Sequence, residues 1–199
     1  MPIFSNLKPY YYEALTQWVS APVHRDIAAH LHKNFSITPG ARVLDIGCGT
    51  GFYRRFFEPQ AYFGVEYSLS CAAFGARKTG AAFSCQDARN LAFRSGSFDL
   101  VFCSNVTHHL SDEILRQMLR EIARVLKPGG QMAIYDVYRP DPEPFRLKLV
   151  YALDLGGHVR TLPALRGLYS EWNRTHEMTL FQNHLYPYYC SHWVKPSCH

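Results

Sequence analysis

A short apolar run that ends in three alternating glycines is the feature that most constrains the fold of this chain. Residues 43–51 read VLDIGCGTG, so Asp45 stands two positions before Gly47. Glycine at Gly47, Gly49 and Gly51 permits positive φ and lets a ligand approach bare backbone, and a helix that begins after such a loop offers N–H groups. The pattern predicts a buried strand, a loop that binds a nucleotide-type ligand, and a helix in direct succession.

Short apolar runs alternate with longer helical patterns, which is typical of an α/β fold with a parallel sheet. The apolar runs predict strands over residues 42–46, 61–66, 81–85, 98–103 and 131–137. The helical patterns predict helices over 9–35 with a break at Pro22, over about 50–58, from a Ser68 cap through Arg77, over 111–126 and 145–154, and after Thr161. Two β-like runs near 174–181 and 188–194 predict a closing antiparallel hairpin. We therefore expect five βα units and a hairpin in a single domain.

The composition excludes several classes of protein. Hydrophobic residues make up 47% of the 199 positions and charged residues 19%, which rules out a disordered or low-complexity chain. No apolar run approaches the roughly 18 residues of a membrane span, and the first residues lack the layout of a signal peptide. We therefore expect a cytoplasmic protein without a transmembrane segment. The formal net charge of +5 permits an anionic partner without requiring one.

The six cysteines do not indicate a metal centre. No two of them form CxxC, and no group of cysteines and histidines has the spacing of a zinc finger. Cys190, His192, Cys198 and His199 lie close together in sequence, but their irregular spacing does not favour a metal site. We expect reduced thiols and no metal.

The acid before the glycine loop separates two classes of nucleotide ligand. A dinucleotide-binding loop requires GxGxxG, and its third glycine position falls on Phe52 or Arg54 in the two possible registers. An acid beside a pyrophosphate is repelled, whereas an acid beside an amino-acid ammonium is attracted. Glu66 ends the second predicted strand, where a carboxylate accepts hydrogen bonds from both ribose hydroxyls. The expected ligand is an adenosine with an amino-acid tail, not NAD(P).

Five segments occur in an order that is informative as a set: VLDIGCGTG (43–51), YFGVEYS (62–68), CQDARNLAF (85–93), FDLVFCSNVTHHL (98–110) and EIARVLKPGGQMAIYDV (121–137). With them the sequence resembles the class I S-adenosylmethionine-dependent methyltransferases, most closely the type-11-like branch that includes quinone-biosynthesis and small-molecule methyltransferases. The resemblance implies a Rossmann-like, doubly wound seven-stranded sheet of order 3-2-1-4-5-7-6. It implies S-adenosylmethionine as cofactor and S-adenosylhomocysteine as product. We expect a helical cap over 1–40, a cofactor-binding core over 41–137 and acceptor-side elements over 138–199.

The resemblance also implies roles for matching positions in cofactor binding. Asp45 would orient the loop and the amino group of the cofactor. The loop residues that would line the methionine portion are Gly47, Cys48, Gly49 and Gly51. Glu66 would hold the ribose, and Tyr67 would pack on the adenine. Asp87 would accept from the adenine amino group, with the Ala88 backbone near the ring. The backbone of Cys103 and Ser104 would face the methionine ammonium.

Methyl transfer from a sulfonium needs a base only if the acceptor loses a proton as it attacks. His108 and His109 follow the fourth strand and are the candidate bases, although a structural role for both is an open alternative. Tyr135 and Asp136 end the fifth strand and are expected near the same mouth. Phe145, Leu149 and Leu153 recur every four residues, which favours a helix stripe facing the core.

The acceptor pocket is expected from residues 1–25 and 138–192, which are rich in tyrosine, tryptophan and histidine: Tyr10, Tyr11, Tyr12, Trp18, His24, Tyr151, His158, Arg160, Trp172, Tyr186 and Tyr188. This supply of aromatic side chains suits an apolar or aromatic small-molecule acceptor. Two alternatives remain open, an RNA methyltransferase and a non-catalytic cofactor-binding module. Arg116, Arg120 and Arg124 form a basic stripe that would suit RNA, but a solvated helix face is the simpler interpretation. The sequence does not indicate an oligomeric state.

Overall fold

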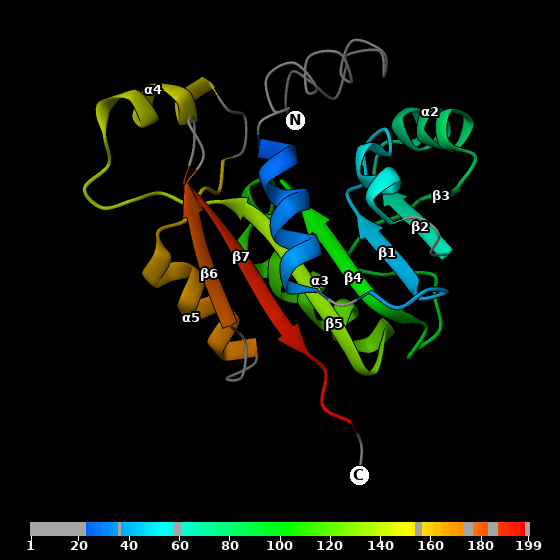
Figure 1. The fold of residues 1–199 in the computed structure, drawn as a ribbon. Helices are drawn as coiled ribbons and strands as arrows, with labels where there is room; N and C mark the ends of the chain where they lie inside the picture. Colours follow the sequence, from blue (N-terminus) through cyan, green and yellow to red (C-terminus); the bar gives the residue numbers. More distant parts are fainter. Residues whose placement is uncertain are drawn as a thin grey trace.

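The computed structural model describes residues 23–35, 37–57, 61–153, 157–172, 177–182 and 187–197. These residues form one seven-stranded sheet with helices against both of its faces (Figure 1). The strand order is β3-β2-β1-β4-β5-β7-β6, which confirms the expected fold class. The helical segment predicted before Pro22 lies outside the described residues.

The strands span Arg42–Ile46 (β1), Ala61–Glu66 (β2), Ala82–Cys85 (β3), Phe98–Ser104 (β4), Leu126–Val137 (β5), Glu177–Gln182 (β6) and Pro187–Val194 (β7). The first five pair in parallel, whereas β7 runs antiparallel to both β5 and β6, which confirms the closing hairpin. β5 begins earlier than expected because Leu126 already pairs with Phe98. The register then shifts before Gln131 pairs with Leu100.

Helices cover residues 23–34 and the segments Phe52–Phe57 (η2), Leu69–Thr79 (α2), Thr107–His109 (η3), Asp112–Val125 (α3), Phe145–Leu153 (α4) and Leu162–Trp172 (α5). The Ser68 cap is present, since its Oγ accepts from the backbone N–H of Cys71 at 3.4 Å. Gly80 in the left-handed region ends α2. Across the described segments, no helix has both the length and the apolar character needed to cross a bilayer.

The helix expected over about 50–58 is confirmed, as the 3-10 helix Phe52–Phe57, in which the N–H of Arg54 donates to the carbonyl of Gly51 three residues back. The expected series of five βα units is wrong at one place. No helix joins β3 to β4, because residues 86–97, all of them described, form turns. Polar side chains satisfy the backbone there: Asp87 accepts from the N–H of Arg89 at 2.9 Å, which offers the chain an alternative to a helix. The five βα units are therefore incomplete.

Helices lie against both faces of the sheet (Figure 1), and an apolar cluster holds each layer in place. On one face, Met118 and Ile122 of α3 pack with Leu168 of α5 and with side chains of β1, β4 and β5. On the other face, Ile27 and Leu31 of the helix over residues 23–34 pack with η2 and with the opposite side of the same strands. Both layers leave the carboxyl ends of β1, β4 and β5 at one edge, where open α/β sheets bind ligands.

α4 exposes the apolar stripe that was expected to face the core. Phe145 and Leu149 are 83% and 58% exposed, whereas Leu147 and Tyr151 on the other side of the helix are buried. The Tyr151 hydroxyl donates to a backbone carbonyl just after β5 at 2.7 Å, which keeps that side of the helix inward. The expected stripe is therefore wrong at Phe145 and Leu149, and the Leu153 side chain lies outside the described residues.

Candidate active site

The glycine loop has the backbone geometry that its sequence predicts. Gly47, Gly49 and Gly51 have φ values of 71°, 53° and 80°, in the left-handed region that favours glycine. The N–H groups of Gly47 and Cys48 both donate to the carbonyl of Val65, at 2.8 and 3.2 Å. The loop is thus held beside the carboxyl end of β2.

Packing inside the protein also requires two of these glycines. A Cβ atom at Gly47 would lie 2.2 Å from Val106 Cγ2, and one at Gly51 would lie 2.7 Å from Phe83 Cζ. Both distances are shorter than carbon atoms tolerate, so a side chain at either position displaces its neighbour. The contact at Gly47 also shows that the loop directly adjoins the segment after β4.

Asp45 is buried at the end of β1 rather than exposed on the loop. It is 1% exposed, and its Oδ2 accepts a hydrogen bond from the Tyr62 hydroxyl at 2.6 Å. Burial raises the pKa of Asp45 to about 7, although the Tyr62 hydrogen bond opposes the shift, and the charge of Glu66 adds to it. A cation that binds close to the loop would draw Asp45 into its ionised form.

Glu66 connects the end of β2 to the glycine loop. Its Oε2 accepts from the N–H of Gly49 at 3.0 Å, and its Oε1 accepts from the N–H of Ser68 at 2.9 Å. The next residue, Tyr67, is 72% exposed, and Leu69 beyond it is 71% exposed. A carboxylate, a stretch of bare backbone and an exposed aromatic ring are therefore adjacent. This set of groups fits a ribose and a purine ring.

The segment after β3 reaches the same place. The N–H of Gln86 donates to the carbonyl of Glu66 at 3.1 Å. Asp87 forms an ion pair with Arg89 at 2.6 Å, and the hydrogen bonds from Arg89 hold the pKa of the Asp87 carboxyl below its usual value. Ala88 is partly buried and packs against the core. Asp87 thus retains its charge at neutral pH and shares its oxygens with a neighbouring guanidinium.

The end of β4 offers backbone and a hydroxyl rather than a reactive thiol. Cys103 is fully buried, and burial raises the pKa of its thiol well above the usual value. Ser104 Oγ lies 3.1 Å from the Tyr53 hydroxyl, which in turn lies 2.6 Å from Nδ1 of His24. Asn105 has a φ of 58°, a strained value for a residue with a Cβ atom. Strain of this kind is concentrated at ligand sites.

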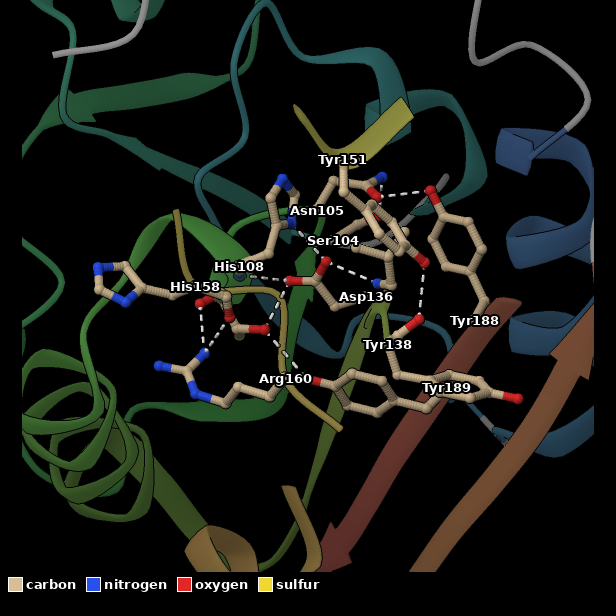
Figure 2. A network of polar contacts seen from close by, with 12 residues as sticks. Ser104, Asn105, His108, Asp136, Tyr138, Tyr151, His158, Arg160, Tyr188 and Tyr189 are labelled. Atoms are coloured by element: carbon tan, nitrogen blue, oxygen red, sulfur yellow. Dashed lines mark hydrogen bonds and ion pairs between the residues drawn. The ribbon is translucent and has the colours of Figure 1, made fainter. Parts of the chain in front are cut away.

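A polar network joins the residues after β4 to β5 and β7 (Figure 2). Asp136 at the end of β5 accepts from Thr107 Oγ1 at 2.6 Å and contacts His108 Nδ1 at 2.5 Å. Thr107 Oγ1 also lies 3.0 Å from the Tyr189 hydroxyl. Burial opposes ionisation of Asp136, but the charge and hydrogen bond of His108 hold the pKa of this carboxyl below its usual value. His108 is buried, whereas His109 is exposed.

Arg160 holds the same loop from the segment before α5. Its guanidinium donates through Nη1 to the carbonyl of Thr107 at 2.9 Å, through Nη2 to that of Leu110 at 2.5 Å, and through Nε to Asp112 at 2.8 Å. The Arg160 side chain is 7% exposed. The sequence placed Arg160 only among acceptor-pocket candidates, because no local pattern links it to a loop so distant along the chain.

Tyr135 does not lie at the mouth where it was expected. It is fully buried on the face covered by the helix over residues 23–34, and its hydroxyl lies 2.9 Å from Nδ1 of His30. Alternation along β5 explains the error, since consecutive strand residues point to opposite faces. The side chain of Trp172 lies outside the described residues. So do five further acceptor-pocket candidates: Tyr10, Tyr11, Tyr12, Trp18 and Tyr186.

Among the residues that the structure describes, no group of three histidine, cysteine or acidic side chains is arranged to hold a metal ion. Cys190 and His192 lie in β7. Cys198 and His199, the other members of the cluster considered from the sequence, are outside the described residues.

Comparison with known proteins finds a methyltransferase domain within the chain. Residues 44–134 match the family model described as a methyltransferase domain. The matched residues include the glycine loop, Glu66, Asp87 and His108. The match agrees with the resemblance to class I S-adenosylmethionine-dependent methyltransferases that the sequence shows.

Relatives of this chain have diverse names. It is 39% identical over 98 residues to a probable tRNA methyltransferase 9B of Bos taurus, a match that covers 49% of this chain and 21% of that protein. It is 35% identical over 146 residues to the sterol 24-C-methyltransferase ERG6B of Gibberella zeae, covering 63% and 37% respectively. The chain therefore spans well under two thirds of the length of these relatives.

A solved structure supports the fold. The phosphoethanolamine N-methyltransferase 2 of Haemonchus contortus, in complex with phosphomonomethylethanolamine and S-adenosylhomocysteine, superposes with a TM-score of 0.73 at 18% identity. The match covers 87% of this chain and 53% of that one. At this identity the likeness concerns the arrangement of the strands and helices.

Proposed function

We propose that this methyltransferase transfers a methyl group from S-adenosylmethionine to an apolar or aromatic small molecule. The observation that carries the proposal is the contact between Glu66 and Gly49. It places a carboxylate against a glycine loop and next to the exposed ring of Tyr67. One relative is named a tRNA methyltransferase and another a sterol methyltransferase. We therefore infer the class of acceptor from the residues of this chain.

Each cofactor contact is assigned from the chemistry of the group that faces it. Glu66 holds the ribose hydroxyls, Tyr67 stacks on the adenine, and Asp87 accepts from the adenine amino group beside the Ala88 backbone. The methionine end lies against the glycine loop and the end of β4: Gly47, Cys48, Gly49, Gly51, Cys103 and Ser104. Asp45, buried at the end of β1, supplies a negative charge that attracts the ammonium group of the cofactor's methionine portion.

When bound, the cofactor supplies an electrophilic methyl group on a sulfonium. The chain then has to orient the acceptor in line with the breaking bond and keep water away, and positioning of this kind supplies several kcal/mol. Tyr188 contributes to this positioning, because its hydroxyl donates to Asn105 at 2.8 Å and fixes the strained residue after β4 (Figure 2).

The exposed apolar side of α4 supports an apolar acceptor. Phe145 and Leu149 lie on a helix that follows β5, beyond the carboxyl edge of the sheet (Figure 1). Exposed large apolar side chains near a ligand-binding edge are typical of sites that take up apolar molecules.

RNA is the second candidate, favoured by the tRNA methyltransferase relatives. The basic stripe on α3 gives it little support. Arg116 pairs with Glu171 at 3.0 Å, and Arg124 pairs with Glu121 at 2.7 Å while donating to the carbonyl of Leu91. Two of the three arginines are thus engaged within the protein, on a helix that covers a face of the sheet.

Labelled methyl transfer separates the two candidates. The protein is incubated with S-adenosylmethionine labelled on its methyl group and either an organic-solvent extract of metabolites or total RNA. Label in the metabolite fraction, abolished by Glu66→Ala, supports the proposal. Label that enters RNA and is lost after ribonuclease treatment would establish the second candidate instead.

A further inference from the structure

The contact between His108 and Asp136 lies next to the proposed site of methyl transfer. Val106 touches the glycine loop at Gly47, and His108 follows two positions later in η3. Asp136 ends β5, beside β4 in the sheet. The pair is therefore at the carboxyl edge, between the methionine end of the proposed cofactor site and the acceptor-side elements.

Asp136 determines which nitrogen of His108 handles a proton. An ionised carboxylate only accepts hydrogen bonds, so the 2.5 Å contact requires a hydrogen on Nδ1. Asp136 also accepts from the backbone N–H groups of His108 and Val137, at 3.1 and 2.8 Å, which fixes the carboxylate itself. In the neutral ring the basic nitrogen is then Nε2, on the side turned away from Asp136 (Figure 2).

The loop that carries His108 is fixed from two further directions. The N–H of His158 donates to the carbonyl of His108 at 3.0 Å, and Arg160 holds the carbonyls of Thr107 and Leu110. Such support confines the ring to one orientation.

We propose that His108, oriented by Asp136, removes a proton from the methyl acceptor, and that the acceptor group is a phenolic hydroxyl. The proposal rests on the proposed function, since it concerns the acceptor of the same methyl transfer. A neutral amine attacks through its own lone pair, and a thiol with a pKa of roughly 8.5 ionises with little help. A phenol, with a pKa of roughly 10, gains most from a base whose ordinary pKa is about 6.5.

Proton removal and methyl transfer are coupled in this step. The phenolic O–H bond breaks as its proton passes to His108 Nε2, and an oxygen electron pair forms the new bond to the methyl carbon. The methyl–sulfur bond breaks, and its electron pair stays on sulfur in S-adenosylhomocysteine. The imidazolium that results is stabilised by the Asp136 carboxylate until the proton passes to water.

Of the two histidines expected as bases, His108 is assigned the role because its ring is fixed by a carboxylate. The ring centroid of the exposed His109 lies 4.0 Å from the ring centroid of His108, and His109 is assigned no proton transfer. Among the described residues, the charged or titratable groups near His108 include His109, Asp136, Tyr189, His158 and Arg160. They come from η3, β5, β7 and the segment before α5.

The tautomer of His108 is a test that needs no acceptor. Nitrogen NMR of histidine-labelled protein bound to S-adenosylhomocysteine, assigned with His108→Asn, is expected to show hydrogen on Nδ1 and an unprotonated Nε2 above the pKa of the ring. Asp136→Asn is expected to reverse this, because its amide donates to Nδ1. Hydrogen on Nε2 in the neutral wild-type ring would overturn the proposal.

Transfer assays test the acceptor class with 2-naphthol, catechol and 4-hydroxybenzoate against 2-naphthylamine and 2-naphthalenethiol. We expect transfer to a phenol that His108→Asn reduces roughly a hundredfold at unchanged S-adenosylhomocysteine affinity, while His32→Asn on an exposed helix face has no effect. Wild-type activity should rise through one ionisation with pH, and the His108→Asn profile should lose that step. Transfer confined to the amine or thiol, no transfer to any phenol, or a fully active His108→Asn protein would refute the proposal. Failure to bind S-adenosylhomocysteine would refute the proposed function instead.

Discussion

Gly47 lies so close to Val106 that a Cβ atom on the glycine would stand 2.2 Å from Val106 Cγ2. This contact joins the loop after β1 to the segment after β4, and therefore the proposed cofactor site to the proposed catalytic histidine. Neither residue needs a ligand to explain the contact. The glycine loop is consequently part of the folded framework as well as a binding surface.

The first prediction concerns this contact. Gly47→Ala should lower the free energy of unfolding of the ligand-free protein by ~1–2 kcal/mol for a left-handed alanine and by a further ~1–3 kcal/mol for overpacking against Val106. Urea denaturation measures the loss. The double variant Gly47→Ala/Val106→Ala should recover the overpacking part, and a double variant no more stable than Gly47→Ala would disprove the clash.

Gly49 provides the matched comparison within the same loop. Its φ of 53° is also left-handed. A Cβ atom there is expected to meet the methionine portion of the cofactor, so we expect Gly49→Ala to weaken S-adenosylhomocysteine binding more than it lowers stability. Calorimetry and urea denaturation on one preparation measure both effects. Normal affinity in a strongly destabilised Gly49→Ala protein would show that this glycine serves only the fold.

The second residue to test is Glu66 itself. Glu66→Ala removes charge-assisted hydrogen bonds to the ribose, each worth ~1.5–3 kcal/mol, and should weaken cofactor binding at least tenfold. It also removes the contacts with the N–H groups of Gly49 and Ser68. Glu66→Gln retains one of the two acceptor oxygens and should lose less affinity. Unchanged affinity in Glu66→Ala would remove the main support for the proposed site.

Asp45 should give the ligand-free protein a specific pH dependence. Its pKa is raised from 3.8 to about 7 on folding, so between these values the folded protein binds more protons at this site than the unfolded chain. The Asp45 contribution to the free energy of unfolding therefore falls as pH rises from about 4 to 7 and is constant above. Urea denaturation measures this effect. As pH rises from about 4 to 7, the free energy of unfolding of the wild type should fall relative to that of Asp45→Asn. A difference independent of pH would contradict the burial of an ionisable Asp45.

Arg160 should matter more to stability than an arginine in a surface pair. Arg160→Met leaves the carbonyls of Thr107 and Leu110 without their buried donor and should cost ~2–3 kcal/mol. Arg116→Met, which loses a pair with the exposed Glu171, should cost less than ~1 kcal/mol. Thermal and urea denaturation of both variants give the comparison, and equal losses would show that Arg160 does not hold the loop.

The sheet could be predicted from the sequence because its strands are short apolar runs bounded by turn residues, and the glycine loop because left-handed glycines have a recognisable spacing. The turns after β3 could not, since local side-chain hydrogen bonds such as the one that Asp87 accepts from the N–H of Arg89 decided them. The apolar spacing around Phe52 predicted a helix there but not its 3-10 geometry. The exposed side of α4 was also missed, because the same four-residue spacing fits either side of a helix whose partner is unknown.

The candidate site was predictable where one strand end carries the residue, as at Glu66. Two other contacts join segments that are distant along the chain. His108 contacts Asp136, and Arg160 donates a hydrogen bond to the Thr107 carbonyl. No periodicity or motif encodes such contacts. Only the folded structure shows that the carboxyl ends of β4 and β5 belong to one polar network.

Isothermal titration calorimetry with S-adenosylhomocysteine and NADH tests the central claim most directly. A buried acid beside the glycine loop and Glu66 at the end of β2 predict binding of one S-adenosylhomocysteine per chain, more tightly than NADH, and at least tenfold weaker in Glu66→Ala. Tighter binding of NADH, or binding of S-adenosylhomocysteine that does not depend on Glu66, would contradict the account.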